Sequence, residues 1–564
     1  MSRGTAPVDP DDVLDPGLAV GPLAAVLRPL RTAWEDELAG DVVAAAAVQP
    51  LVAALLAERD APLLVVTPRT ADAEAMADAL GAVLGPDRVA VLPPWETLPA
   101  ERLSPRAETV GRRLAVVDRL ARPSEHTAPL LVVVAPVRAA LQPMDPRVAD
   151  RRPLRLAPGR EGFDAVVVEL AGLGYERVAQ VEERGQFAVR GGIVDVFPTA
   201  ADAAVRLEWF GDQLESLRTF GVGDQRSTGP SGPVVVDPAR ELVLDDELAR
   251  RAAAAVAAAP AHAETLTALA EGRSAEGVEA LALALRGDAV LVADLLPPGA
   301  PLLLVEPVRS EERARAVAAD AETLAEATWD LDGAGAAVGY AAPSDLVARI
   351  EGRGGRVVRV SALPHAGAAP LPGTGWDSLR GDVAALGARA RGLLAAGVRV
   401  VVAVDADGPA RRVADVLGAE GVPAVVVPAL PPRPEPGRVE VVVSGLRAGV
   451  DAPGVGLAVL ATVDVFGPRR RRAGRRLGSR LRAADAVVSL MAGDAVVHRT
   501  HGVGRFRGMV TREVEGLDGR VGRRDFVVVE YAGGDVLYVP SDQVDALTRY
   551  RGGDDPTVMR MGGA

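Results

Sequence analysis

Short apolar runs alternate with amphipathic stretches near the start of the chain. The run Leu63–Thr67 (LLVVT) is apolar except for its last residue, and Thr70–Leu84 places Ala, Met and Leu at helical spacing. The same alternation continues with a run, an amphipathic stretch and another run: Val89–Leu92, Glu108–Leu120 and Leu130–Ala135. Apolar strands that alternate with helices are typical of a parallel, doubly wound sheet. We therefore predict an α/β unit over residues 22–153.

Residues 154–229 change to a period of two. In 174–220 (GYERVAQVEERGQFAVRGGIVDVFPTAADAAVRLEWFGDQLESLRTF), short alternating segments are interrupted at Gly185, at Gly191-Gly192 and at 210–212. This pattern predicts an antiparallel sheet with one buried face. The α/β pattern returns over 230–370, with an Ala-rich helical stretch at 246–285 and a strand at Pro301–Val305. The β segment is therefore expected to be inserted between two halves of an α/β region.

The rest of the chain predicts two further domains joined by an arginine-rich linker. Residues 371–467 repeat a βαβ pattern, with a turn at Asp407-Gly408 and a proline-rich loop at 428–437. The predicted elements are strand Arg399–Val404, helix Pro409–Leu417 and strands Ala424–Val427, Val439–Ser444 and Leu457–Thr462. Residues 485–550 predict four strands and a hairpin turn at 532–535: Ala495–His498, Arg505–Val510, Asp525–Tyr531 and Val536–Pro540.

Composition removes several classes of chemistry. A chain of 564 residues without cysteine has no disulfide, thiolate zinc site or cysteine nucleophile. All 63 basic residues are arginine, so no lysine is present to complete a phosphate-binding loop of the G-x-x-x-x-G-K-[ST] type. No signal peptide is recognised and no apolar run is long enough to span a bilayer, so we expect a cytoplasmic protein with no membrane partner.

The candidate chemical motifs are weak. Residues 38–56 precede a helix where a nucleotide loop would lie, but they hold one glycine and no lysine. The stretch 241–247 (ELVLDDE) resembles a metal-binding strand end, yet Asp245 or Asp246 is better interpreted as a helix cap. His498 and His501 are the only close pair of histidines and have no third ligand. We therefore expect no catalytic residues, no metal and no cofactor.

Three segments carry a family resemblance. These are the β segment around Phe187–Pro198 (FAVRGGIVDVFP), WETLPAERLSPRAETVGRRLAVV near residue 100, and GDAVVHRTHGVGRF near residue 500. The first resembles the UvrA-docking domain shared by UvrB and the transcription-repair coupling factors (the Mfd family), and only that family carries all three. The resemblance implies a multidomain α/β protein: degenerate nucleotidase-like parallel sheet domains with an inserted antiparallel β domain, then a small α/β domain and a C-terminal Tudor-like β barrel.

The domains implied by the resemblance follow the pattern boundaries. They are an N-terminal segment (1–21) packing on the 230–370 domain, a UvrB-like α/β domain with a degenerate ATP site (22–153), a UvrA-docking β domain (154–229), a second UvrB-like α/β domain (230–370), a small α/β domain (371–467), an Arg-rich linker (468–484), an RNA-polymerase-interacting barrel (485–551) and a tail toward a translocase (552–564).

The resemblance also implies binding residues. UvrA would contact Arg177, Phe187 and Arg190. One alternative is that Arg190 braces the Gly191-Gly192 turn. Another, which we favour for both phenylalanines, is that Phe187 and Phe197 lie in the core. An open strand edge would extend a sheet of the RNA polymerase β subunit through these residues: Val496, Val497, His498, Arg499 and Gly502. Arg499 departs from the apolar residue of many relatives. Nucleic-acid contact by Arg469, Arg470, Arg471 and Arg472 competes with a solvated linker helix, which we favour.

The implied function is transcription-coupled repair. The chain would tether to stalled RNA polymerase and present a UvrA-docking surface, which the resemblance implies is masked in the resting full-length protein. The family's ATP-dependent translocase, with its ATP, magnesium and most DNA contact, would lie outside this chain. UvrB's aromatic hairpin also has no counterpart in the short segment 91–105. Two rival functions are a UvrB-type ATPase that acts as a damage-loading protein and a stand-alone CarD-like transcription regulator.

Overall fold

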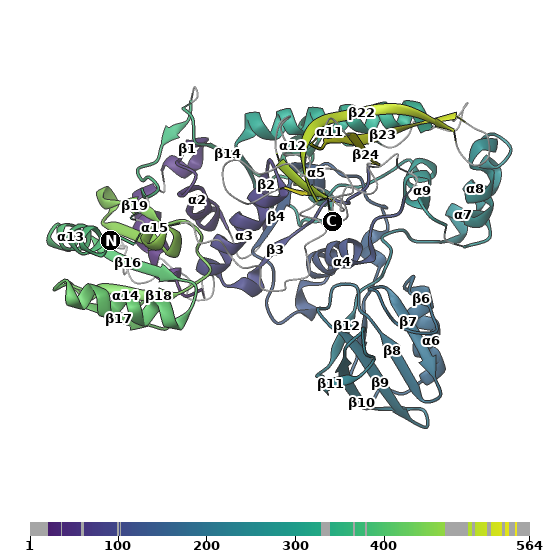
Figure 1. Cartoon of the computed structure of the whole chain (residues 1–564), viewed down its shortest axis with the longest axis horizontal. Helices are drawn as coiled ribbons and strands as arrows, with labels where there is room; N and C mark the ends of the chain where they lie inside the picture. Colours follow the sequence, from purple (N-terminus) through teal and green to yellow (C-terminus); the bar gives the residue numbers. More distant parts are fainter. Residues whose placement is uncertain are drawn as a thin grey trace, which may run out of the picture. The chain divides into compact units, whose positions relative to one another are not determined.

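The structure, a computed structural model, describes residues 21–467 and 495–549 with internal gaps. The residues outside the description within these ranges are 35, 58–60, 99–100, 102, 274, 329–338, 365–366, 378, 380, 499–501, 516–520, 533–535 and 541–546. The chain divides into two units, residues 1–469 and residues 470–564. Each unit is described by itself (Figure 1).

A seven-stranded parallel sheet forms the centre of the first unit. Its strand order is β15-β1-β14-β13-β2-β4-β3, with these bounds: β1 Val42–Val43, β2 Leu63–Thr67, β3 Val89–Val91, β4 Val132–Pro136, β13 Leu302–Val305, β14 Val357–Ser361 and β15 Ala369–Pro370. Strand β13 pairs with β2, so the ranges 22–153 and 230–370 contribute to one sheet. The predicted insertion of the β segment between two halves of one α/β region is therefore confirmed, and the ranges 22–153 and 230–370 together build a single sheet.

Helices cover both faces of this sheet. Leu63 and Val65 of β2 face one core with α1 (Leu27–Trp34), α2 (Gln49–Leu56) and α3 (Thr70–Leu84). The alternate residues Leu64 and Val66 face the other core, with helices α4 Ala107–Ala121, α5 Val137–Ala140, α10 Val292–Leu295, α11 Pro307–Thr328 and α12 Pro343–Gly352. Strand β2 and helix α3 have the predicted bounds, because a fully apolar run followed by a helical period is an unambiguous signal.

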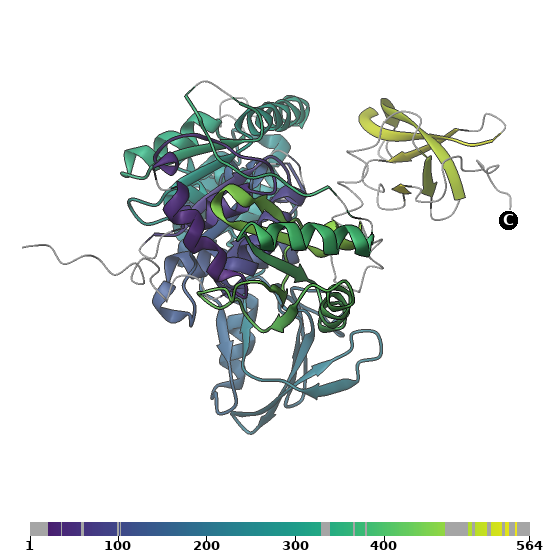
Figure 2. The ribbon, with the colours of Figure 1, turned by 90° about the vertical axis from the view of Figure 1, so that its left-hand side faces the viewer.

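The alternating segment forms a separate lobe of the first unit (Figures 1 and 2). Its six strands run in the order β11-β10-β9-β8-β7-β6, with these bounds: β6 Glu176–Arg177, β7 Gln186–Arg190, β8 Ile193–Val196, β9 Ala204–Phe210, β10 Gln213–Phe220 and β11 Ser227–Pro230. All neighbours are antiparallel except β6 and β7. Helix α6 (Phe163–Gly172) contributes to the core on one face. The predicted breaks at Gly191-Gly192 and 210–212 are confirmed.

A two-stranded ladder joins this lobe to the seven-stranded sheet. Strand β5 (Leu154–Leu156) enters the lobe and β12 (Val234–Val236) leaves it, and the two pair in antiparallel fashion. The Ala-rich stretch that follows is three helices with their own core, α7 Asp246–Ala255, α8 Ala263–Ala270 and α9 Val278–Arg286. The Asp245 carboxylate accepts from Leu248 N at 2.8 Å and caps α7, as the sequence predicts.

The small α/β sheet has the order β17-β18-β16-β20-β19, in which only β19 is antiparallel. Its elements are α13 Val383–Ala395, β16 Arg399–Val404, α14 Asp407–Ala419, β17 Ala424–Val427, β18 Val439–Val443, β19 Val450–Ala452, β20 Leu457–Ala461 and α15 Thr462–Phe466. Asp407-Gly408 is the first turn of α14 and not a separate turn; the acidic side chain suits the positive end of the helix dipole. Residues of β16 and β18 join the core around α1–α3, so this sheet packs against the larger one.

The second unit holds a five-stranded antiparallel sheet in the order β24-β23-β22-β21-β25. Its strands are β21 Ala495–His498, β22 Gly502–Glu515, β23 Val521–Glu530, β24 Val536–Pro540 and β25 Leu547–Arg549. Strands β22 and β23 are longer than predicted, because their alternation continues through polar residues. Closure of the sheet into a barrel stays a prediction, and most of the turn at 532–535 lies outside the described residues.

Candidate functional site

The six-stranded sheet of the β lobe has two different faces. Successive residues of a strand point to opposite faces, and directly paired residues share a face. Val194, Leu207 and Leu217 point inward and are buried in the core with α6. On the outer face, one end is closed by a second small core that includes Ala188, Phe197, Ala204 and Phe220. The other end of the outer face is left without such a cover among the described residues.

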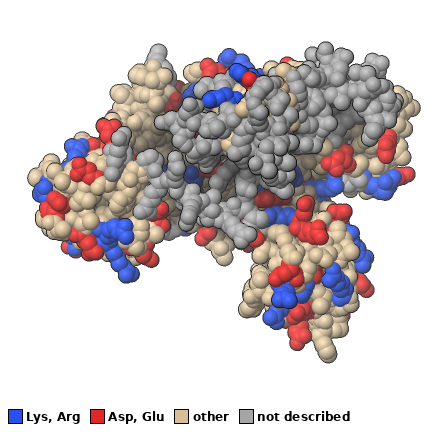
Figure 3. Space-filling view, in the orientation of Figure 1, with Lys and Arg blue, Asp and Glu red and all other residues tan. Residues whose placement is uncertain are grey.

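This open end carries a cross-strand row that we call the outer row: Arg190, Ile193, Glu208 and Ser216. The register pairs Arg190 with Ile193, Ile193 with Glu208, and Glu208 with Ser216. The Ser216 hydroxyl donates to Glu208 Oε2 at 2.5 Å, which fixes the carboxylate on this face. Both signs of charge are interspersed on the side of the lobe visible in Figure 3. The outer row is therefore a mixed polar and apolar surface held on rigid strands.

Arg190 is exposed and fixed at one point. Its Nη2 donates to Ala179 O at 2.7 Å, so it braces the segment after β6 rather than the Gly191-Gly192 turn. Arg177 is also exposed, but it is aligned with Phe187 in the parallel ladder and so lies on the inner-face side of edge strand β6. The structure thus places the two arginines on opposite faces of the sheet and does not bring them together.

Phe187 is 1% exposed within the core beneath α6. Direct contact between its side chain and a partner, which the resemblance implies, does not fit this burial. Phe197 is also buried, and the Arg184 guanidinium lies 4.7 Å from its ring centroid. Both phenylalanines are therefore core residues, the interpretation favoured from the sequence, because each occupies the buried side of an alternating strand or its continuation.

Sequence reasoning missed several residues of the open face. Arg206 forms a two-pronged ion pair with the buried Asp195, with 2.7 Å from Nε to Oδ1 and 2.9 Å from Nη2 to Oδ2. Glu208 and Phe210 follow on the same face, and Phe210 is 81% exposed. The signal was present in RLEWF (206–210), where alternate residues are charged or aromatic and the residues between them are apolar.

The lobe is seated on α4 through a cluster of charges. The buried carboxylate of Asp118 on α4 accepts from Arg122 Nε at 2.6 Å and Arg155 Nη2 at 3.2 Å, and its Oδ2 lies 3.0 Å from His126 Nε2. Asp237, just after β12, is also buried. The pKa of the Asp237 carboxyl is raised to about 7, mainly by burial and also by the Asp118 charge, while the Arg155 charge opposes the rise. The seat of the lobe therefore contains a proton-sensitive carboxyl.

The sheet edge at the start of α2, where a nucleotide-binding loop would lie, is occupied by protein side chains. Strand β1 is followed by Ala44–Val48 and then by α2, whose first residue is Gln49. The Gln49 amide donates to Ala44 O at 3.2 Å and to Glu306 Oε1 at 2.7 Å, and Ala362 N donates to the same oxygen at 2.9 Å. A fixed carboxylate beside the start of α2 would repel phosphate, so this arrangement does not favour nucleotide binding.

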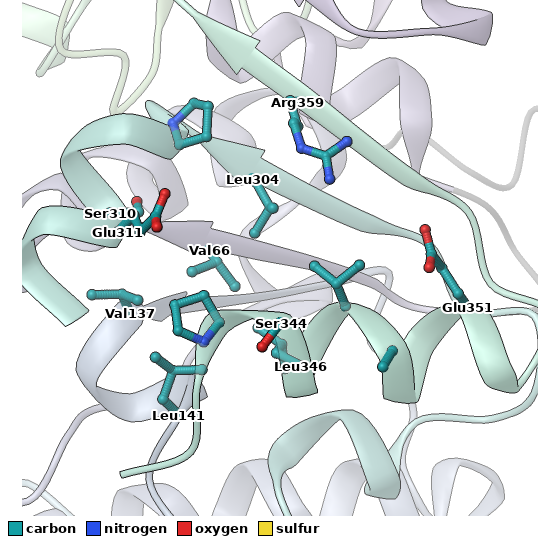
Figure 4. A pocket seen from close by; sticks show the side chains of 14 residues that line it. Val66, Val137, Leu141, Leu304, Ser310, Glu311, Ser344, Leu346, Glu351 and Arg359 are labelled. Carbon is teal, nitrogen blue, oxygen red and sulfur yellow. The ribbon is translucent and has the colours of Figure 1, made fainter. Parts of the chain in front are cut away.

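A cavity of about 400 Å³ lies between this sheet and helices α11 and α12 (Figure 4). Val66 and Leu304 form its floor, and Leu346 closes one side. Its charged lining residues are Glu311, Glu351 and Arg359. Among the described residues, no group of three acidic or histidine side chains could hold a metal ion.

In the second unit, β21 is an interior strand. It pairs with β22 on one side and with β25 on the other, and Val496 is fully buried. Sheet extension along β21 is therefore wrong for this sheet, because its main-chain groups already have two neighbours. Gly502 begins β22 and pairs with His498. Arg499, His501 and the arginines Arg469–Arg472 lie outside the described residues.

Two domain families match the chain. The UvrB interaction domain family matches residues 155–242, which include the β lobe, and the CarD-like/TRCF RID domain family matches residues 490–551, which include the five-stranded sheet. The chain therefore combines a UvrB interaction domain and a CarD-like/TRCF RID domain with parallel α/β sheets. Within the described ranges, every helix is too short or too polar to cross a membrane.

The relatives identify the family. The chain is 39% identical to the transcription-repair-coupling factor of Mycobacterium tuberculosis over 94% of this chain and 45% of that protein. Identity is 31% to the Myxococcus xanthus factor, over 96% of this chain and 47% of that protein, and 26% to the Escherichia coli factor, over 94% of this chain and 47% of that protein. The chain thus corresponds to the N-terminal part of a transcription-repair-coupling factor, and it spans about half the length of these relatives.

Proposed function

We propose that this chain provides the partner-docking part of a transcription-repair-coupling factor, with the β lobe docking UvrA and the second unit docking RNA polymerase. The observation that carries the proposal is the open half of the outer face. It presents Arg190 and Ile193 on rigid strands inside the range matched by the UvrB interaction domain family. Arginine suits such a surface because its planar fork pairs with carboxylates and stacks on neighbouring groups.

A charge reversal at Arg190 tests this proposal. Arg190→Glu should weaken UvrA binding at least ~30-fold, which corresponds to ~2 kcal/mol at a hot-spot arginine. Arg411→Glu is the matched control, because Arg411 is an exposed arginine on α14 of the small α/β sheet. Affinity is measured by titration calorimetry, with circular dichroism as a check on folding. Equal affinities for wild type and Arg190→Glu, with both folded, would reject the outer row as the docking surface.

Polymerase docking by the second unit rests on the match to the CarD-like/TRCF RID family. If main-chain pairing is used, it requires a strand with only one neighbour. Among the described strands of this sheet these are β24 and β25. A pull-down of RNA polymerase by the full chain tests this docking, and no polymerase retained by a folded chain would contradict it.

We further propose that the described residues carry out no nucleotide chemistry. The carboxylate of Glu306 and the amide of Gln49 occupy the edge that a UvrB-type ATPase would need for phosphate. The stand-alone regulator is disfavoured by similarity to coupling factors along 94% of the chain. We assign polymerase displacement to the full-length family member. Its ATP-dependent DNA translocase would bind ATP and magnesium and make the main DNA contacts.

A further inference from the structure

Phe210 is the most exposed large apolar residue in the described part of the chain, at 81%. It is the last residue of β9 and pairs with Gln213, the first residue of β10. Its neighbour Trp209 points inward, is 8% exposed, and meets Phe163 of α6 edge-on at 5.6 Å between ring centroids. The Phe210 ring therefore projects from the outer face beside the outer row.

The exposure of Phe210 does not arise from a frayed hairpin. Trp209 N donates to Gly192 O at 2.8 Å, which ties β9 to the turn before β8. Asp212 holds the start of α6, since its Oδ1 accepts from Phe163 N at 2.8 Å and its backbone oxygen accepts from Gly162 N at 3.0 Å. The next strand is tied by Gly159 N donating to Leu214 O at 2.8 Å. The fold thus holds the backbone that carries this aromatic ring in a fixed position.

A single exposed apolar residue is ordinary on a protein surface. Phe210 differs in its surroundings. Glu208, a member of the outer row, lies two residues before it on the same face, and the exposed Arg190 lies two strands from Glu208 in that row. Arg218, which lies opposite Arg206, adds a second exposed arginine to this face. An aromatic ring beside arginines, with half-buried residues between them, has the composition of an interface hot spot.

We propose that Phe210 is the apolar anchor of this docking face, and that it inserts into an apolar pocket of the partner protein whose rim carries carboxylates facing Arg190 and Arg218. The inference rests on the proposed docking of UvrA and names the recognition chemistry of that same face. A protein is favoured over a nucleic acid as the occupant, because Glu208 and Asp212 flank the ring and would repel phosphates.

The test compares Phe210→Ser with Val168→Ser in the full chain. Val168 is the matched control, since it is 70% exposed on α6, on the other side of the sheet. Phe210→Ser should weaken UvrA affinity at least ~30-fold and Phe210→Leu less than ~10-fold, whereas Val168→Ser should change it less than ~2-fold. Circular dichroism and Trp fluorescence should be unchanged.

The other outcomes are distinguishable. If Arg190→Glu abolishes UvrA binding while Phe210→Ser leaves it intact, the docking face stands and the anchor is overturned. If neither variant affects UvrA binding, the proposed function of the face fails as well. If Phe210→Ser leaves UvrA binding intact but abolishes binding of a fluorescent single-stranded oligonucleotide, the ring is a base-stacking platform and the protein-anchor proposal is overturned.

Discussion

The two antiparallel sheets of this chain offer a partner different things. The six-stranded sheet leaves half of one face open, so side chains on paired strands form its candidate surface. The five-stranded sheet encloses its predicted docking strand β21 between β22 and β25, so among its described strands only β24 and β25 have a side without a neighbour. An alternating segment therefore identifies a sheet but not which of its strands lie at an edge. A face and an edge are therefore tested by different substitutions.

The largest expected effect is loss of the folded five-stranded sheet on substitution in its interior strand β21. Val497→Pro should unfold the five-stranded sheet, because proline removes a ladder donor in a strand with neighbours on both sides, at a cost of ~3 kcal/mol or more. Val536→Pro, at the first residue of β24, is the control and should be tolerated. Hydrogen exchange over 495–549 measures the outcome. Native protection in the Val497→Pro variant would show that β21 behaves as an edge after all.

A pH-dependent effect is expected at the seat of the β lobe. Because the folded pKa of Asp237 is raised to about 7, the folded chain holds a proton that the unfolded chain releases near pH 4. The contribution of Asp237 to the free energy of unfolding therefore falls as pH rises from about 4 to about 7, and is level above that.

Asp237→Asn should remove this decline and stabilise the lobe by up to ~4 kcal/mol at pH 8, with little change at pH 4. The measurement is hydrogen exchange of the lobe strands across this pH range. Parallel pH profiles for wild type and Asp237→Asn would contradict a proton held at the seat.

A smaller effect separates stability from docking on the open face. Arg206→Ala should lower the free energy of unfolding of the lobe by about 3 kcal/mol, because it leaves the buried Asp195 carboxylate unpaired. Arg190→Ala should change it by less than ~0.5 kcal/mol, since Arg190 is exposed and makes a single hydrogen bond. Urea unfolding monitored by tryptophan fluorescence compares the two variants. Equal losses would mean that the outer row is structural.

The smallest expected effect is that of nucleotide. Millimolar ATP with magnesium should not shift the thermal midpoint of the chain, because Glu306 occupies the edge beside α2 and no lysine is present. Hydrolysis above background in the presence of DNA, or a nucleotide-dependent shift in the midpoint, would reopen the ATPase interpretation.

The fold was predictable where local patterns decide it. Strand β2, helix α3 and strand β16 have the predicted bounds, because apolar runs and helical spacing are local signals. The enclosure of β21 was not predictable, since its second neighbour β25 lies about fifty residues later and alternation carries no strand order. The opposite faces of Arg177 and Arg190 depend on the parallel pairing of β6 with β7, an exception in an otherwise antiparallel sheet. Phe210 was visible in the alternation of RLEWF, and its exposure follows from the hairpin geometry.

Hydrogen exchange of the full chain with and without UvrA decides whether this partner binds the outer face of the β lobe. We expect slower exchange at Gly191–Ile193 and at 206–216 when UvrA is present, with unchanged exchange in α6 on the other side of the sheet. Protection confined to α6 or to the small α/β sheet, with the outer row unaffected, would show that UvrA does not bind there.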